Sequence, residues 1–99
     1  DMRDTNDRVK GTIPGSISIP YTEVVDRLSE LGCTKTASTW NCAAAKPVYA
    51  FCNGPTCPQS PIAIRAMTRE GFPADKIYYY RGGMLDWDAL GLTSVKNEF

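Results

Sequence analysis

The sequence predicts an α/β domain with a mainly parallel sheet. Short apolar runs alternate with segments that carry helix-start and helix-stop residues, a pattern typical of parallel strands joined by helices. At 99 residues the chain has room for one modest core, so we expect a single domain over residues 1–99. Its apolar content of 42% and charged content of 22% are those of an ordinary globular domain.

Charge and composition exclude several classes of function. The 11 basic and 11 acidic residues cancel and form no basic cluster, so we expect no nucleic-acid partner. No apolar stretch approaches the roughly 20 residues that span a bilayer, so we expect no membrane insertion. The chain has no histidine, which excludes histidine general bases and histidine metal ligands. Other side chains or the backbone must carry any chemistry.

The first half of the chain predicts a strand, a helix and a loop. A short alternating run predicts a strand over Ser16–Ile19. Residues 21–32 predict a helix that Thr22 caps and Gly32 terminates. The polar stretch 33–46 has weak periodicity and is predicted as a loop. The apolar stripe of the predicted helix consists of Val24, Val25, Leu28 and Leu31.

The second half predicts two buried strands and two helices. Residues 47–51 form an apolar run that begins with proline, which predicts a strand buried on both faces. Residues 76–80 are rich in aromatic side chains and predict another buried strand. Between them we expect a central helix with Ser60 as N-cap, Pro61 in the first helical position and Gly71 just past its end. A Gly-Gly turn leads into a short helix within residues 81–91.

Cys52 is the candidate nucleophile. It directly follows the strand predicted at 47–51, at the carboxyl edge where parallel sheets bind ligands. The loop then enters the amino end of a helix, where free N–H groups favour a thiolate and an anionic adduct. The plain alternative is that Cys52 is a small buried residue that ends a strand. Pro55 and Pro58 have no N–H, and the N–H groups that can turn inward belong to Asn53, Gly54, Thr56, Cys57, Gln59 and Ser60.

Three separated motifs resemble the rhodanese-like domain family. "DMRDTNDRVKGTIPGSISIP" resembles its opening signature, with threonine in place of the usual histidine at position 12. "VYAFC" resembles the strand that ends in the catalytic cysteine, and "GFPADKIYYYRGGMLDWDALGL" resembles the closing pattern. The motifs occur in the family's order and cover nearly the whole chain. The elements that normally precede the opening motif are missing, so we expect a truncated first element or a segment of a longer protein.

The resemblance implies both a fold and an activity. The implied fold has about five strands in a parallel sheet with helices on both faces. The implied activity is sulfur transfer: Cys52 takes sulfur from thiosulfate or a persulfide donor and passes it to cyanide or a thiol. Residues Asn53–Ser60 would form the substrate-binding loop, in which the available N–H groups stabilise the persulfide. No metal or organic cofactor is implied.

The loop departs from the family pattern. "CNGPTCPQS" contains no lysine or arginine, whereas the family often has arginine there, as in C-R-x-G-x-R-S. Thiosulfate is a dianion, and a loop without arginine has no positive side chain to balance its charge. Thiosulfate is therefore less favoured as the natural donor. Arg65 and Arg81 are the candidate substrate-charge contacts, and each is equally well explained as a surface arginine.

The other cysteines leave several interpretations open. Cys57 is either a thiol that resolves an adduct on Cys52, a hydrogen-bond donor in the loop, or the nucleophile itself. The resolving role would make the protein a dithiol redox switch, which is our second prediction of function. Cys33 and Cys42 are predicted to form a disulfide, which implies a periplasmic or otherwise exported protein. Free thiols in a cytoplasmic protein are the alternative. The cysteine spacings do not resemble those of structural zinc sites.

Two further functions compete with sulfur transfer. A non-catalytic module would bind a protein partner, but such modules usually lack the nucleophile, which is present here. A phosphatase or arsenate reductase would need an arginine to close the cysteine loop, and this loop has none.

Overall fold

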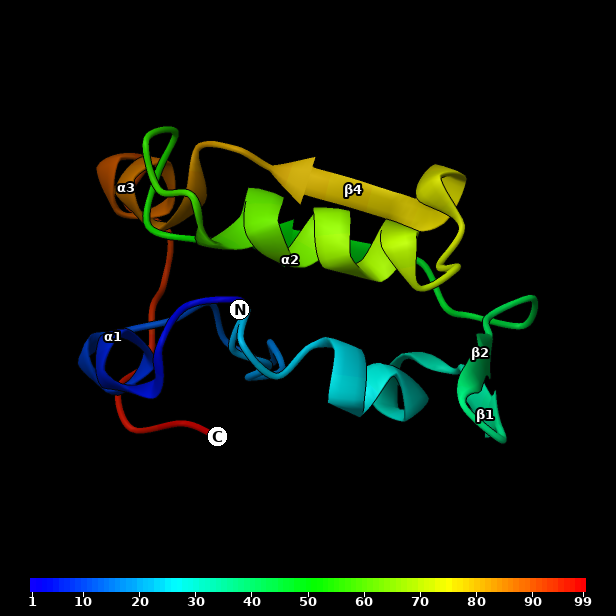
Figure 1. Ribbon diagram of the computed structural model, residues 1–99. Coiled ribbons are helices and arrows are strands. Elements are labelled where there is room, and N and C mark those ends of the chain that lie inside the picture. The colour runs from blue at the N-terminus through cyan, green and yellow to red at the C-terminus, as the bar shows by residue number, and fades with distance from the viewer.

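The computed structural model describes residues 1–99, which form a body 43 × 23 × 20 Å in extent (Figure 1). None of the helices has the length and apolar character that a bilayer-spanning segment requires. In chain order the elements are α1 (Thr5–Lys10), the 3-10 helix η1 (Val25–Leu31), β1 (Thr34–Thr36), β2 (Thr39–Asn41), β3 (Val48–Phe51), α2 (Gln59–Arg69), the 3-10 helix η2 (Ala74–Lys76), β4 (Ile77–Tyr80) and α3 (Gly83–Ala89).

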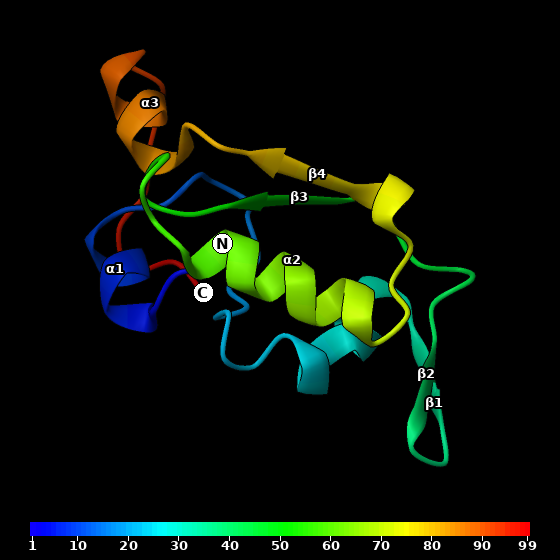
Figure 2. The same ribbon diagram turned by 45° about the horizontal axis from the view of Figure 1, so that its top comes forward.

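The parallel pair β3–β4 forms one layer, and α2 covers one of its faces (Figure 2). Val48 and Ala50 of β3 are buried in the core, together with Ala63 and Met67 of α2. Tyr49 alternates to the other face and is 70% exposed. Its ring stacks on Tyr78 of β4 with centroids 4.8 Å apart. The expectation that the strand at 47–51 is buried on both faces is therefore wrong, and so is the expectation that the strand at 76–80 is buried, because these tyrosines remain exposed to solvent.

The sheet is smaller than the five strands expected. The structure has two two-stranded sheets, β1–β2 and β3–β4, and Ser16–Ile19 is not a strand. The N–H of Ile19 still donates to the carbonyl of Asp1 (3.0 Å), and the N–H of Met2 donates to that of Phe51 (3.1 Å). Residues 1–2 thus join the segment before Pro20 to β3. These bonds are too few for a regular ladder, and Pro20 has no N–H with which to extend it.

The segment predicted as a helix at 21–32 is the kinked 3-10 helix η1. Arg27 has non-helical angles (φ −112°, ψ 18°) at the kink, and no side chain caps the start. The β-branched pair at its beginning disfavours a regular α-helix. The predicted apolar stripe nevertheless faces the core, with Leu28 fully buried. Gly32 ends the element in the left-handed region (φ 93°), as predicted.

The stretch predicted as a polar loop contains the hairpin β1–β2. Thr34 pairs with Asn41, so Cys33 and Cys42 come next to each other just outside the ladder. The two cysteines form a disulfide with Cα atoms 4.3 Å apart. The hairpin projects at the end of the molecule away from α1 and α3 (Figures 1 and 2).

Helix α2 begins two residues earlier than expected and ends as predicted. Its N-cap is Pro58, not Ser60, and Pro61 occupies the third helical position. Proline is tolerated there because the first four N–H groups of a helix have no partner within it. At the other end Gly71 (φ 99°) donates to the carbonyl of Thr68, and Phe72 donates to that of Met67. These two bonds form a Schellman motif.

Candidate active site

Cys52 lies at the carboxyl end of β3, where the chain turns into the loop that leads to α2. Its side chain is almost fully buried, with 1% of the residue exposed. The loop occupies the end of the molecule that also holds α1 and α3, opposite the hairpin (Figures 1 and 2). The predicted nucleophile is thus at the sheet edge that sequence reasoning assigned to it.

Helix α3 fixes the start of this loop. The N–H of Met84 donates to the carbonyl of Cys52 (3.0 Å), and that of Leu85 donates to the carbonyl of Asn53 (2.7 Å). Both donors lie in the first turn of α3, where the backbone N–H groups have no acceptor within the helix. Gly83 lies directly against the Cys52 carbonyl with φ 58°, and a Cβ there would collide with that oxygen. The Gly-Gly turn therefore holds the backbone of Cys52 in place.

The loop leaves most of its N–H groups without acceptors. The N–H of Cys57 donates to the carbonyl of Gly54 (3.1 Å), which closes a turn within the loop. Free N–H groups at a helix start attract anions. The N–H groups for which the structure records no acceptor are those of Asn53, Gly54, Thr56, Gln59 and Ser60.

Ser60 adds a buried hydroxyl to this region. The residue is fully buried in the first turn of α2, and its Oγ has no hydrogen-bond partner. A buried polar atom without a partner costs about 1–3 kcal/mol. Sequence reasoning expected this side chain to cap the helix, which it does not do.

The structure joins Cys52 and Cys57 by a disulfide. Their Cα atoms are 6.3 Å apart, within the range that disulfides span. Cys57 is partly exposed, whereas Cys52 is buried. The loop therefore brings both thiols to one point, and Cys57 is the one nearer to solvent.

Gln59 connects the sulfur of Cys52 to the start of α1. Its Oε1 lies 3.9 Å from the Sγ of Cys52, and its Nε2 donates weakly to Oδ2 of Asp4 (3.5 Å). In the disulfide the sulfur has no proton to give, so the first contact becomes a hydrogen bond only with the reduced thiol. Gln59 was predicted only as a loop residue.

Arg3 is a residue of the site that sequence reasoning missed. Its Nη1 donates to Oδ1 of Asn53 (3.0 Å), next to Cys52, although only 4% of Arg3 is exposed. Nε and Nη2 hold the Asp1 carboxylate, each at 2.9 Å. Burial lowers the pKa of Arg3 from its ordinary value, but a guanidinium remains protonated in proteins. The signal was the Asp-x-Arg pattern, interpreted only as a family signature.

Thr12 completes the support behind Arg3. It is fully buried and donates from Oγ1 to Oδ2 of Asp1 (2.9 Å). This hydroxyl occupies the position where the family pattern has histidine. Its role is to hold the carboxylate that orients Arg3.

Neither Arg65 nor Arg81 contacts the loop through a hydrogen bond or an ion pair, although the Gly-Gly turn that follows Arg81 packs against the loop backbone. Both are exposed, and neither side chain makes a hydrogen bond or an ion pair. Arg65 borders a hollow between α2 and β4 that contains no residue of the cysteine loop.

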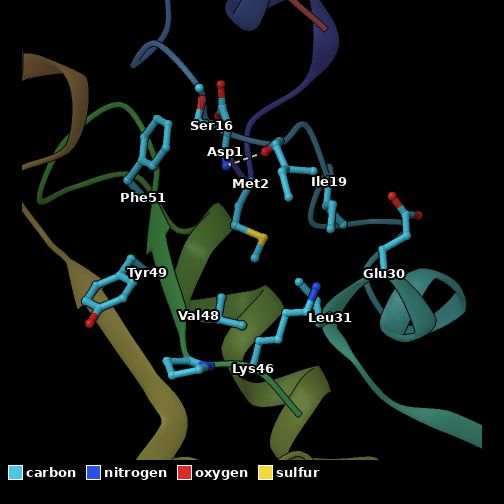
Figure 3. A pocket seen from close by; sticks show the side chains of 13 residues that line it. Asp1, Met2, Ser16, Ile19, Glu30, Leu31, Lys46, Val48, Tyr49 and Phe51 are labelled. Carbon is cyan, nitrogen blue, oxygen red and sulfur yellow. Dashed lines mark hydrogen bonds between the residues drawn. The ribbon is translucent and has the colours of Figure 1, made fainter.

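Asp1 and Met2 line a separate cavity of about 280 Å³ (Figure 3). It is mainly apolar, with Met2, Val48 and Leu31 around it and charged groups of Glu30 and Lys46 nearby. It includes none of residues 52–60, so the loop chemistry does not take place there.

The family model of the rhodanese-like domain matches residues 1–90, which include the cysteine loop and α3. The chain belongs to the rhodanese-like domain family. The rhodanese-like domain is also 32% identical over 92 residues to the HTH-type transcriptional regulator Rv0324 of Mycobacterium tuberculosis. That match covers 93% of this chain and 34% of the regulator, so the chain spans about a third of the relative's length. No solved structure matches it.

Proposed function

We propose that this rhodanese-like domain is a sulfurtransferase that carries sulfane sulfur as a persulfide on Cys52. The observation that carries the proposal is the position of Cys52, at the end of β3 within a loop that has several free N–H groups. A persulfide anion needs such donors because the loop has no lysine or arginine.

The transfer takes two displacement steps at the reduced protein. The thiolate of Cys52 attacks the outer sulfur of the donor, forms a sulfur–sulfur bond and expels sulfite from thiosulfate or a thiol from a persulfide. Cyanide or an acceptor thiol then attacks the outer sulfur of the Cys52 persulfide and leaves with it. Cys52 returns as a thiolate, so neither an oxidant nor a cofactor enters the cycle.

The charge of the loop favours a persulfide donor over thiosulfate. Arg3 is the one cation bonded to a loop side chain, and its guanidinium also neutralises Asp1. Little positive charge therefore remains to balance thiosulfate, which is a dianion. A persulfide donor carries a single negative charge, which the backbone N–H groups of the loop can stabilise. We propose that the acceptor is a thiol, on a small molecule or on a partner protein.

The test is the rate of thiocyanate formation with cyanide as acceptor, measured with each donor for the reduced Cys57→Ser variant, in which no internal disulfide can form. We expect activity that Cys52→Ser/Cys57→Ser lacks and that is higher with a persulfide donor than with thiosulfate. Equal rates for Cys57→Ser and the double variant would contradict the proposal.

A second candidate function is a dithiol redox switch, which the Cys52–Cys57 disulfide favours. A switch of this kind forms and loses the disulfide reversibly and needs no sulfur donor. Cys57→Ser separates the two candidates, because sulfur transfer to cyanide survives in this variant and the internal disulfide cannot form. We also propose an oxidising location, periplasmic or otherwise exported, on the basis of the Cys33–Cys42 disulfide. Alkylation of protein taken directly from cells tests that location.

A further inference from the structure

We propose that Cys57 converts the Cys52 persulfide into free sulfide, which makes the domain a sulfide-releasing enzyme that an external dithiol resets. This inference rests on the proposed function, since it begins from the persulfide. It assigns a separate reaction to Cys57, which cyanide-dependent transfer does not require.

The position of Cys57 carries the proposal. The loop folds back through the Gly54–Cys57 turn, and the two sulfurs meet in a disulfide with Cα atoms 6.3 Å apart. A thiol held this close reacts as an intramolecular nucleophile and competes with acceptor thiols that must diffuse to the site. Cys57 also lies two residues before α2, where the helix start favours its thiolate.

The atom that Cys57 can reach decides which sulfur it attacks. An external acceptor attacks the outer sulfur of the persulfide, as in the transfer proposed above. Cys57 instead reaches the Sγ of Cys52 itself, which is the atom it bonds in this structure. Attack at that sulfur expels the outer sulfur as hydrosulfide, a good leaving group because thiols of low pKa leave faster.

The step balances without an added oxidant. The Cys57 thiolate forms a bond to Cys52 Sγ, the bond between Sγ and the outer sulfur breaks, and its electron pair leaves with hydrosulfide. The sulfane sulfur is reduced to sulfide, and the two cysteines are oxidised to the disulfide. The oxidised loop seen here is the product of this step. A dithiol reductant then attacks Cys57, the more exposed sulfur, and restores both thiols.

The experiment is a single turnover without oxygen. Reduced protein is treated with one equivalent of a low-molecular-weight persulfide, and both released sulfide and intact mass are followed. Wild type is expected to release one sulfide per chain and to end two hydrogens lighter than the reduced protein. Cys57→Ser and Cys57→Ala should keep the added sulfur, with a persulfide lifetime at least about tenfold longer. The double variant Cys33→Ser/Cys42→Ser, which lacks the hairpin thiols, should behave like wild type.

The outcomes separate this inference from the proposed function. If no variant gains sulfur, the persulfide role of Cys52 fails, and the inference fails with it. If Cys57→Ser gains sulfur but releases sulfide as fast as wild type, only the inference is overturned. Sulfur retained in wild type and located on Cys57 would also overturn it, because Cys57 would then have attacked the outer sulfur.

Discussion

Gly83 packs against the carbonyl group of Cys52 in a conformation that only glycine adopts without strain. Its φ is 58°, and a Cβ would meet the Cys52 carbonyl and would lie 2.9 Å from the nitrogen of Gly54. These are backbone atoms of the candidate catalytic loop, so the collision cannot be relieved by turning a side chain. The position of the loop therefore depends on a residue 31 positions further along the chain (83 − 52).

Gly83→Ala is expected to displace the loop and to reduce sulfur transfer more than stability alone would explain. We expect a loss of about 2–4 kcal/mol in the free energy of unfolding, from left-handed strain and the backbone collision together. Urea unfolding and thiocyanate formation measure the two effects. Gly91→Ala is the matched control, since Gly91 also has a positive φ (73°) but nothing lies near its Cβ position. The Gly91→Ala variant should lose about 1 kcal/mol in the free energy of unfolding and keep its rate of sulfur transfer. Equal effects at both glycines would contradict the role of the contact.

Arg3→Lys is expected to destabilise the protein although it keeps the charge. A lysine cannot hold Asp1 through two parallel bonds while also bonding the carbonyl of Gly11 and the side chain of Asn53. Breaking such a buried pair costs about 3–5 kcal/mol, and the retained charge reduces this to about 2–4 kcal/mol.

Denaturant unfolding measures the effect of Arg3→Lys, with Arg65→Lys as the control. Arg65 is exposed and its side chain has no partner, so its replacement should stay within about 0.5 kcal/mol of wild type. If both variants unfold alike, the buried network does not contribute as described.

The Cys33–Cys42 disulfide is expected to contribute stability without contributing to sulfur transfer. The two cysteines have a sequence separation of 9. The chain entropy lost from the unfolded state by closing a loop of this size stabilises the fold by about 2–3 kcal/mol. The double variant Cys33→Ser/Cys42→Ser should lose that amount in unfolding experiments and keep its rate of thiocyanate formation at low temperature. A fall in that rate while the protein remains folded would show that the hairpin acts on the site.

A new positive charge in the loop should change the preference between donors. Thr56 is exposed and its N–H is one of the free donors, so Thr56→Arg places a guanidinium beside the anion. A charge at the surface is worth about 1 kcal/mol, or roughly fivefold in rate, and a dianion gains more than a monoanion. The measured quantity is the ratio of kcat/KM for thiosulfate to that for the persulfide donor. It should rise with Thr56→Arg, fall back with added salt and stay unchanged with Thr56→Gln.

Local signals in the sequence predicted the elements of the fold in part. The Schellman motif at the end of α2 follows from Gly71, because glycine permits the left-handed backbone that this motif needs. The start of the same helix was misplaced because Pro58 and Pro61 both fit the first turn, and local chemistry does not choose between them. The disulfide Cys33–Cys42 was predicted from spacing, while the hairpin that aligns the two cysteines was missed.

Long-range contacts could not be predicted from sequence pattern alone. Arg3 reaches Asn53 across a separation of 50 residues, and nothing in the loop sequence indicates that partner. The strands at 47–51 and 76–80 were expected to be buried because they are apolar, but burial depends on which elements cover each face. Only one face is covered by α2, so Tyr49 and Tyr78 stack on the exposed side.

The most direct test of the central claim is the intact mass of fully reduced protein after incubation with a persulfide donor, measured for the Cys57→Ser variant. In this variant the added sulfur cannot leave through the internal disulfide. We predict a gain of one sulfur atom that cyanide removes as thiocyanate and that Cys52→Ser/Cys57→Ser lacks. An unchanged mass in Cys57→Ser, or an equal gain in the double variant, would contradict the assignment of Cys52 as the persulfide carrier.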